Sequence, residues 1–260
     1  MITARSNNQL KQIAKLLKKR SAREEERTYV IEGKKMFFEA VTQVPDSLIK
    51  AYWSQSGLSG LSEEERALMK ACPYEEVTDD AFGAVSETVT PQGVIALMRM
   101  PEHSADGIVS SGKGILLLET LQDPGNLGTI LRTAEAAGIG GIILSADSVD
   151  AFSPKVVRAT MGAIWRVPFV YTEQFTETLK MLKNRNVTLC AAHLAGSVPY
   201  DRADYKGQCG ILIGNEGNGL SDEVTALCDV RIRIPMEGQA ESLNAGVAAA
   251  LLMYELKRHG

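Results

Sequence analysis

Six short apolar segments recur through the second half of this chain, each separated from the next by enough residues to form a helix. They lie at residues 114–119, 141–145, 167–171, 187–193, 209–213 and 230–234. The first of them, GILLLE, is a continuous apolar run, which is typical of a strand covered on both faces. Strands that alternate with helices predict an α/β fold with a mostly parallel sheet. Ligands bind such sheets at the loops beyond the carboxyl ends of the strands.

A smaller α/β domain is predicted for the first 100 residues. Strands and helices alternate there, at 29–33, 34–44, 49–55, 62–72 and the end of 90–100. The stretch PEHSADGIVSSGK has the Pro, Ser, Gly and Asp content of a linker. The sequence therefore predicts an N-terminal domain at 1–100, a linker at 101–113 and a larger domain at 114–260.

Composition excludes several classes of protein. Apolar residues make up 45% of the chain and charged residues 23%, as in ordinary globular proteins. No apolar run is long enough to cross a membrane, and the N-terminus lacks the apolar core of a secretory signal. The four cysteines are scattered, without a C-x-x-C pair or a histidine at ligand spacing. We therefore expect reduced thiols, no metal and a cytoplasmic location.

The net charge of −4 is unevenly distributed along the chain. Residues 1–35 hold ten Lys or Arg against four Glu, so this segment carries +6 and the remainder −10. A basic segment on an acidic body favours a polyanion such as a nucleic acid as partner. The alternative is an ordinary solvated helix that buries a stripe of Ile13, Leu16 and Leu17.

Three strand-to-helix junctions in the larger domain share an unusual composition. The first, QDPGNLGTILR at 122–132, ends its strand with Pro and Gly, and Asn126 is predicted to cap a helix from 127 to 137. The third, at 232–255, has a glycine-containing loop before a helix predicted from 242 to 257.

The second junction, ILIGNEGNGLSDEV at 211–224, is rich in glycine. It lacks the Lys and Ser/Thr of a P-loop, and its G-x-x-G-x-G order differs from the dinucleotide fingerprint G-x-G-x-x-G. The Glu216 carboxylate would repel a pyrophosphate. Glycines still allow a ligand to approach the backbone, so a zwitterionic or cationic ligand suits this loop better.

In combination, the three junctions resemble the three motifs of the SpoU (TrmH) family of RNA ribose 2′-O-methyltransferases, within the SPOUT superfamily. The resemblance covers residues 114–258, and SPKVVRATMGAIWRVPF at 153–169 looks like the family's connecting region. The first domain is similar to the ribosomal-protein-like RNA-binding domain of many members, through VIEGKK and TPQGVIAL.

The resemblance implies a deep trefoil knot in the C-terminal domain, an obligate homodimer and S-adenosylmethionine as cofactor. It places cofactor contacts at the backbone of Gly214, Ile234 and Leu243, with Met236 near the adenine. The polar active-site set that it implies is Asn126, Arg132, Glu216, Ser242 and Asn244. The small residues Ala245, Gly246, Ala249 and Ala250 suit close helix packing, either across a dimer or within the chain.

The expected reaction is methyl transfer to a ribose 2′-hydroxyl, with large-subunit ribosomal RNA favoured over transfer RNA. A noncatalytic RNA-binding factor in ribosome assembly is the competing class, and the complete polar set argues against it. The family assigns Arg132 a part in activating the hydroxyl. Since a guanidinium stays protonated, we expect Arg132 to hold the adjacent RNA phosphate and to favour the developing alkoxide.

Overall fold

The computed structural model describes residues 1–195 and 197–259, which divide by their contacts into two compact units. Unit 1 comprises Met1–Pro101 together with Asp150–Trp165. Unit 2 comprises Glu102–Val149 and the chain from Arg166 onward. No helix among the described residues is both long and apolar enough to span a membrane.

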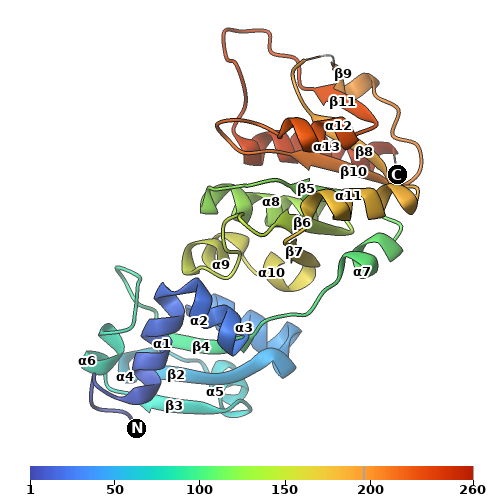
Figure 1. Ribbon diagram of the computed structural model, residues 1–260. Coiled ribbons are helices and arrows are strands. Elements are labelled where there is room, and N and C mark those ends of the chain that lie inside the picture. The colour runs from blue at the N-terminus through green and yellow to red at the C-terminus, as the bar shows by residue number, and fades with distance from the viewer. Residues whose placement is uncertain (196, 260) are drawn as a thin grey trace. The chain divides into compact units, whose positions relative to one another are not determined.

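Unit 1 is built on a four-stranded sheet in the order β1-β4-β2-β3 (Figure 1). Only the β2–β3 pair is parallel. The strands are β1 (Thr28–Glu32), β2 (Leu48–Ser54), β3 (Tyr74–Val77) and β4 (Val94–Arg99). The helices are α1 (Asn8–Lys18), α2 (Arg20–Glu26), α3 (Lys34–Gln43), α4 (Gln55–Ser59), α5 (Glu63–Lys70) and α6 (Asp79–Gly83). The predicted strands and helices are confirmed, and the half-polar YEEV of β3 was not predicted.

Residues 150–165, which lie inside the larger domain predicted from the sequence, belong to unit 1. They carry α9 (Pro154–Thr160) and most of α10 (Ala163–Arg166). Trp165 Nε1 donates to the Tyr29 hydroxyl at 2.6 Å, and the rings of Tyr29 and Phe152 lie 4.8 Å apart. The Arg23 guanidinium, 4% exposed, pairs with Asp150. This segment therefore completes the core of unit 1, although it follows the first two strands of unit 2.

Unit 2 has a seven-stranded sheet in the order β7-β6-β5-β10-β8-β11-β9, in which every pair is parallel. The strands are β5 (Ile115–Leu118), β6 (Gly141–Ser145), β7 (Phe169–Thr172), β8 (Thr188–Ala192), β9 (Val198–Pro199), β10 (Cys209–Ile213) and β11 (Val230–Arg233). All six predicted strands and the parallel α/β fold are confirmed. All four residues of β5 are fully buried, as its apolar run predicts.

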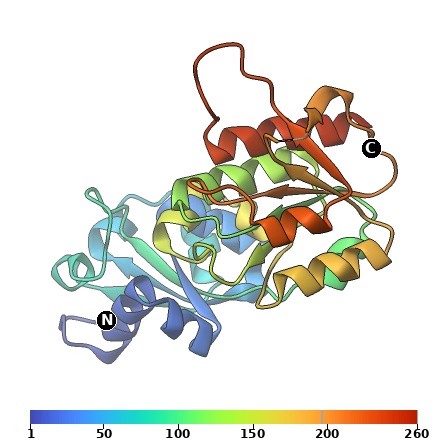
Figure 2. The same ribbon diagram turned by 45° about the horizontal axis from the view of Figure 1, so that its top comes forward.

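Helices cover both faces of this sheet. One face packs against α7 (Ala105–Ser110), α11 (Phe175–Asn184) and α12 (Asp222–Leu227). The other carries α8 (Pro124–Ala137) and α13 (Ala245–His259), which lie side by side in green and dark red in Figure 2. The predicted linker at 101–113 thus contains α7, whose Ile108 and Val109 are buried in the core of unit 2. The Pro, Ser and Gly content of this segment predicted a linker, whereas the segment contains a short helix with buried apolar residues.

The small-residue face of α13 packs within the chain. Ala249 is fully buried, and a Cβ on Gly246 would lie 3.4 Å from the Thr129 side chain of α8. Of the two alternatives open from the sequence, packing within the chain accounts for this face. The large apolar side chains that α13 exposes are Val247, Leu251 and Tyr254.

Candidate active site

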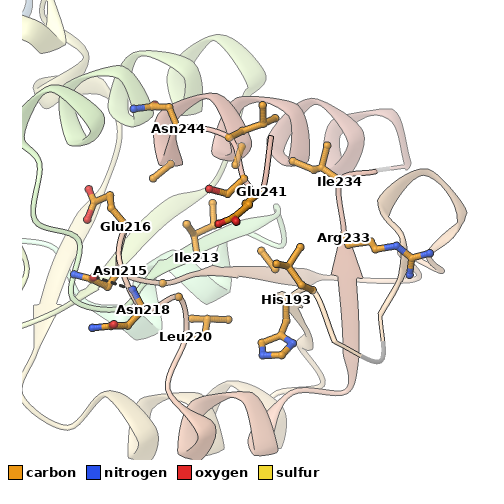
Figure 3. A pocket seen from close by; sticks show the side chains of 18 of the residues that line it. His193, Ile213, Asn215, Glu216, Asn218, Leu220, Arg233, Ile234, Glu241 and Asn244 are labelled. Carbon is orange, nitrogen blue, oxygen red and sulfur yellow. Dashed lines mark hydrogen bonds between the residues drawn. The ribbon is translucent and has the colours of Figure 1, made fainter. Parts of the chain in front are cut away.

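A hollow of about 750 Å³ opens beyond the carboxyl ends of strands β8, β10 and β11 (Figure 3). Its walls come from residues 192–195, 213–220, 232–234 and 241–245, together with Met236 and with Ala248 and Leu252 of α13. This volume suits a small-molecule ligand, and the position is the one expected for ligands of parallel sheets. Two of the three predicted junctions therefore line one hollow.

The first junction is organised differently from the prediction. The cap of α8 is Asp123, whose carboxylate accepts from the Asn126 backbone N–H at 2.8 Å, and Pro124 occupies the first turn. The prediction that Asn126 caps the helix is wrong, because Asp caps as well as Asn and Pro suits the first helical position. Asn126 lies in the first turn, is 6% exposed, and has its side-chain amide free for other partners.

A chain of hydrogen bonds joins the three junctions. Asn244 Nδ2 donates to Asn126 Oδ1 at 2.8 Å, and Asn126 Nδ2 donates to Glu216 Oε1 at 2.9 Å. The amide orientations are consistent, because Asn244 Oδ1 accepts from the Gly246 N–H and Glu216 can only accept when ionised. Three of the five predicted polar residues are thus in direct contact, each from a different junction.

Glu216 is held as a carboxylate. Partial burial alone would raise its pKa, but hydrogen bonds from Asn126 and from the backbone N–H groups of Gln122 and Asp123 outweigh burial and lower the pKa below its ordinary value. The two backbone bonds measure 3.2 and 3.1 Å. A carboxyl with a lowered pKa is a poor proton acceptor near neutral pH, so the geometry favours a positioning role for Glu216.

Asn215, which lines the hollow, and the neighbouring Thr120 hold these loops in shape, and neither was predicted as a site residue. Asn215 Nδ2 donates to the Thr120 carbonyl at 3.0 Å, while its Oδ1 accepts from the Gly217 N–H at 2.8 Å. Thr120 has φ 54°, a conformation unfavourable for a β-branched residue, and its hydroxyl donates to Asp147 at 2.8 Å. A polar residue directly after a buried strand was the available signal for Asn215.

Glycine is required at position 214 for a steric reason. A Cβ there would lie 2.1 Å from the backbone of Gly219, with which the loop closes on itself. Asn215 and Gly219 exchange two backbone hydrogen bonds of 3.0 and 2.9 Å across this closure. The second junction is therefore a tight backbone turn that leaves space for a ligand beside it.

All four predicted cofactor-binding residues line the hollow: Gly214, Ile234, Met236 and Leu243. The backbone groups of Ile234, Met236 and Leu243 form no hydrogen bond with any residue that the structure describes. Free backbone donors and acceptors beside apolar side chains such as Ile213 and Leu252 fit a nucleoside with an apolar ring and polar edges. Ser242 also lines the hollow, and its hydroxyl has no partner in the described chain.

Arg132 lies outside the hollow, on the exposed side of α8. Six residues along an α-helix correspond to a rotation of about 240°, so Arg132 and the buried Asn126 face different directions. Conversely, His193 and Glu241 line the hollow without having been predicted there (Figure 3).

Among the described residues there is no group of three or more His, Cys, Asp or Glu side chains able to hold a metal ion.

Comparison with known proteins identifies both parts of the chain. A model of the SpoU rRNA Methylase family matches residues 113–254, and a model of the MRM3-like substrate binding domain matches residues 7–96. The 23S rRNA (guanosine(2553)-2'-O)-methyltransferase RlmP of Bacillus subtilis is 36% identical over 181 residues, which cover 70% of this chain and 71% of that protein.

Two solved structures with bound cofactor are similar over nearly the whole chain. An AdoMet-bound rRNA methyltransferase from Sinorhizobium meliloti has a TM-score of 0.85 and 32% identity, and covers 99% of this chain and 97% of its own. The SpoU methyltransferase AviRb from Streptomyces viridochromogenes, in complex with AdoMet, has a TM-score of 0.86 and 28% identity, with 97% of each chain covered. The chain belongs to the SpoU rRNA methylase family and is an RNA methyltransferase whose cofactor is S-adenosylmethionine.

Proposed function

We propose that the protein methylates a ribose 2′-hydroxyl of large-subunit ribosomal RNA. The observation that carries this proposal is the unbroken chain from Asn244 through Asn126 to Glu216, which joins the three junctions beside the hollow. A noncatalytic binding factor has no need of that arrangement. Ribosomal RNA is favoured over transfer RNA because RlmP and the Sinorhizobium meliloti enzyme bear rRNA methyltransferase names, whereas two solved structures named for tRNA alone cover only 57% of this chain. Other relatives are named tRNA/rRNA methyltransferases.

The cofactor supplies an electrophilic methyl group on a positively charged sulfur. The residues of the chain bind the cofactor and the RNA, orient the reacting groups and exclude water from them. Asn126 uses both ends of its amide on Asn244 and Glu216, so it positions the junctions rather than the RNA. The Ser242 hydroxyl is free at the rim and is proposed to accept a hydrogen bond from the attacking ribose hydroxyl.

Arg132 is proposed to act on the RNA rather than on the cofactor. It is exposed and forms no hydrogen bond or ion pair within the described residues. A guanidinium is always charged and matches a phosphate with two parallel hydrogen bonds. Placed on the phosphate next to the reacting ribose, it would lower the free energy of the developing alkoxide.

We also propose that the protein is a homodimer, with the knot that the family resemblance implies and in the cytoplasm. The exposed side of α13 supports the dimer. Val247, Leu251 and Tyr254 recur at helical spacing and are 47%, 39% and 50% exposed. We propose that a second copy of the chain packs against this apolar stripe, because a helix of the partner would remove these side chains from water.

Methyl transfer from radiolabelled S-adenosylmethionine tests the function directly. The substrates are deproteinised ribosomal RNA and bulk transfer RNA from a strain that lacks the gene, followed by nucleoside mass spectrometry. We expect one 2′-O-methylnucleoside from 23S RNA. If label appears in transfer RNA alone, transfer RNA is the substrate and the proposed ribosomal RNA is wrong. If the protein binds the cofactor tightly but methylates neither RNA, it is an RNA-binding factor rather than a methyltransferase of these substrates.

A further inference from the structure

The basic N-terminal segment offers fewer free charges than its sequence suggests. At least four of its ten cations form ion pairs with carboxylates of unit 1: Arg5 with Asp80, Lys15 with Glu25 and Glu26, Arg20 with Glu24, and Arg23 with Asp150. Lys18 and Lys19 remain exposed at the end of α1, without a partner among the described residues. Lys34 and Lys35 differ from all of these, because they border a hollow.

This second hollow, of about 650 Å³, lies entirely within unit 1. The first two turns of α3 supply Lys34, Lys35 and Phe38, and the loop before β4 supplies Pro91 and Gln92. The remaining lining comes from α4 and α5. It is separate from the cofactor hollow, whose lining belongs to unit 2.

Glycine backbones shape this hollow. A Cβ on Gly57 would lie 2.5 Å from the carbonyl oxygen of Gly93, so the turn at α4 and the loop before β4 touch through their backbones. Gly93 and Gly33 have φ of 78° and 106°, which L side chains rarely adopt. The loop is also tied to β1, since the buried Glu32 carboxylate accepts hydrogen bonds from Ser86 and Thr88. The hollow is therefore a built feature of the fold.

Most of the polar groups at this site can donate hydrogen bonds. Gln92 Oε1 accepts from the Lys34 backbone N–H at 2.8 Å, which leaves the Gln92 amide N–H groups without a partner in the described chain. Lys34 Nζ lies 3.5 Å from the Gly60 carbonyl, and Lys35 has no partner there. The one lining carboxylate, Glu65, is engaged in capping α5 through the Ser62 N–H at 2.9 Å.

An aromatic ring lies beside these donors. Phe38 is half-buried, with its ring centroid 5.2 Å from Phe37 and 6.1 Å from Trp53. Both neighbours are fully buried, so the Phe38 ring is supported from behind and presents an edge or face to the hollow. Two ammonium groups, a free amide donor and a supported ring match the phosphate, the base edge and the base face of one nucleotide.

We infer that the hollow of unit 1 binds a nucleotide of single-stranded RNA. Lys34 and Lys35 contact the phosphate, Phe38 stacks against the base, and the Gln92 amide donates to the base edge. An acidic peptide would satisfy the lysines but would leave the ring and the amide without a role. The inference rests on the proposed RNA substrate, and it locates the contact at the hollow rather than at the basic end of α1.

Filter binding of the full-length protein to in vitro transcribed 23S RNA, over a range of salt, tests this site. The variant K34A/K35A removes two charges at the hollow, and K18A/K19A removes the same two charges at the end of α1. We expect K34A/K35A to weaken binding roughly 10-fold or more and to reduce the slope of log affinity against log salt by about 1.4. K18A/K19A should weaken binding less than about 3-fold.

Phe38→Leu separates stacking from charge. It should weaken binding by roughly 5- to 100-fold, as loss of one base stack does, with an unchanged salt slope. Thermal unfolding checks that each variant is folded. The K34A/K35A measurement remains a valid test of the site even if Phe38→Leu fails to fold. A larger loss in K18A/K19A than in K34A/K35A overturns the inference. So does unchanged RNA affinity in K34A/K35A, as expected if the hollow serves an acidic protein.

Methyl transfer by the unsubstituted protein is measured in parallel, because it tests the proposed function independently. If the unsubstituted protein methylates RNA but K34A/K35A binds 23S RNA normally, the proposed nucleotide site is wrong and the proposed function stands. If K34A/K35A weakens RNA binding but the unsubstituted protein transfers no methyl group, the nucleotide site stands and the proposed function is wrong.

Discussion

Asn126→Asp tests the hydrogen-bonded chain with the smallest change of shape. The substitution replaces Asn126 Nδ2, which donates to Glu216 Oε1 at 2.9 Å, with a carboxylate oxygen. A hydrogen bond to a charged group, worth about 1.5–3 kcal/mol, is lost. Two carboxylates also come together, and unit charges about 4 Å apart repel by about 1 kcal/mol in water and about 4 kcal/mol at the protein surface.

The pair can escape this repulsion by binding one proton, which limits the penalty. Protonating a carboxyl of ordinary pKa near 4.3 at pH 7 costs about 4 kcal/mol, at 1.36 kcal/mol for each pH unit. At pH 5.5 the same step costs about 2 kcal/mol. Repulsion between like charges raises the pKa of one of the two carboxyls. The contact between positions 126 and 216 is therefore least stable at high pH and becomes more stable as the pH falls and one carboxyl binds a proton.

Calorimetric titration of S-adenosylmethionine from pH 5.5 to 7.5 measures this effect. We expect the N126D variant to bind roughly 1000-fold more weakly than wild type at pH 7, with the deficit shrinking about tenfold for each pH unit down to pH 5.5. Asn126→Ala removes the donor without adding a charge, so its deficit should be independent of pH. Wild-type affinity in N126D at pH 7, or a deficit that ignores pH, would refute the reasoning.

Three further substitutions separate the roles of other residues. Arg132→Lys keeps the charge but loses the planar fork, so single-turnover methyl transfer should fall roughly 10- to 1000-fold, equally at every pH; recovery of the variant towards pH 10 would make Arg132 the proton acceptor. Leu251→Arg should convert the proposed dimer to monomer in sedimentation, because it places a charge on the exposed apolar stripe. Ala249→Arg places a charge in a fully buried position within the chain, so it should lower the melting temperature at any protein concentration. Gly214→Ala should abolish cofactor binding in the same calorimetric assay, because its Cβ would overlap the Gly219 backbone; unchanged affinity would mean that the turn can open without cost.

Periodicity predicted the sheet of unit 2 because a parallel sheet buries its strands on both faces, so each strand appears as an apolar run. The same reasoning missed β3, where two of the four residues are glutamates at the edge of a sheet. It also missed α7, because a six-residue helix contains too few apolar positions to establish a period. Local signals therefore sufficed where burial was complete and failed at edges and short elements.

The site was predicted as a set of residues but not as an arrangement. Capping preference could not distinguish Asp123 from Asn126, since both residue types cap well. That choice decides whether Asn126 serves its own helix or reaches Glu216, which lies 90 residues further along the chain. Interactions between distant junctions depend on the order of strands in the sheet, and no periodicity along the sequence carries that information.

The inclusion of residues 150–165 in unit 1 affects how this protein can be recombined. The chain passes from one unit to the other three times, after residues 101, 149 and 165. A chimera joined at a single point near residue 101 would therefore separate Tyr29 from Trp165 and Arg23 from Asp150. Exchange of unit 1 between relatives therefore requires residues 1–101 and residues 150–165 from the same parent, and the second of these segments lies inside the span that matches the methylase family model.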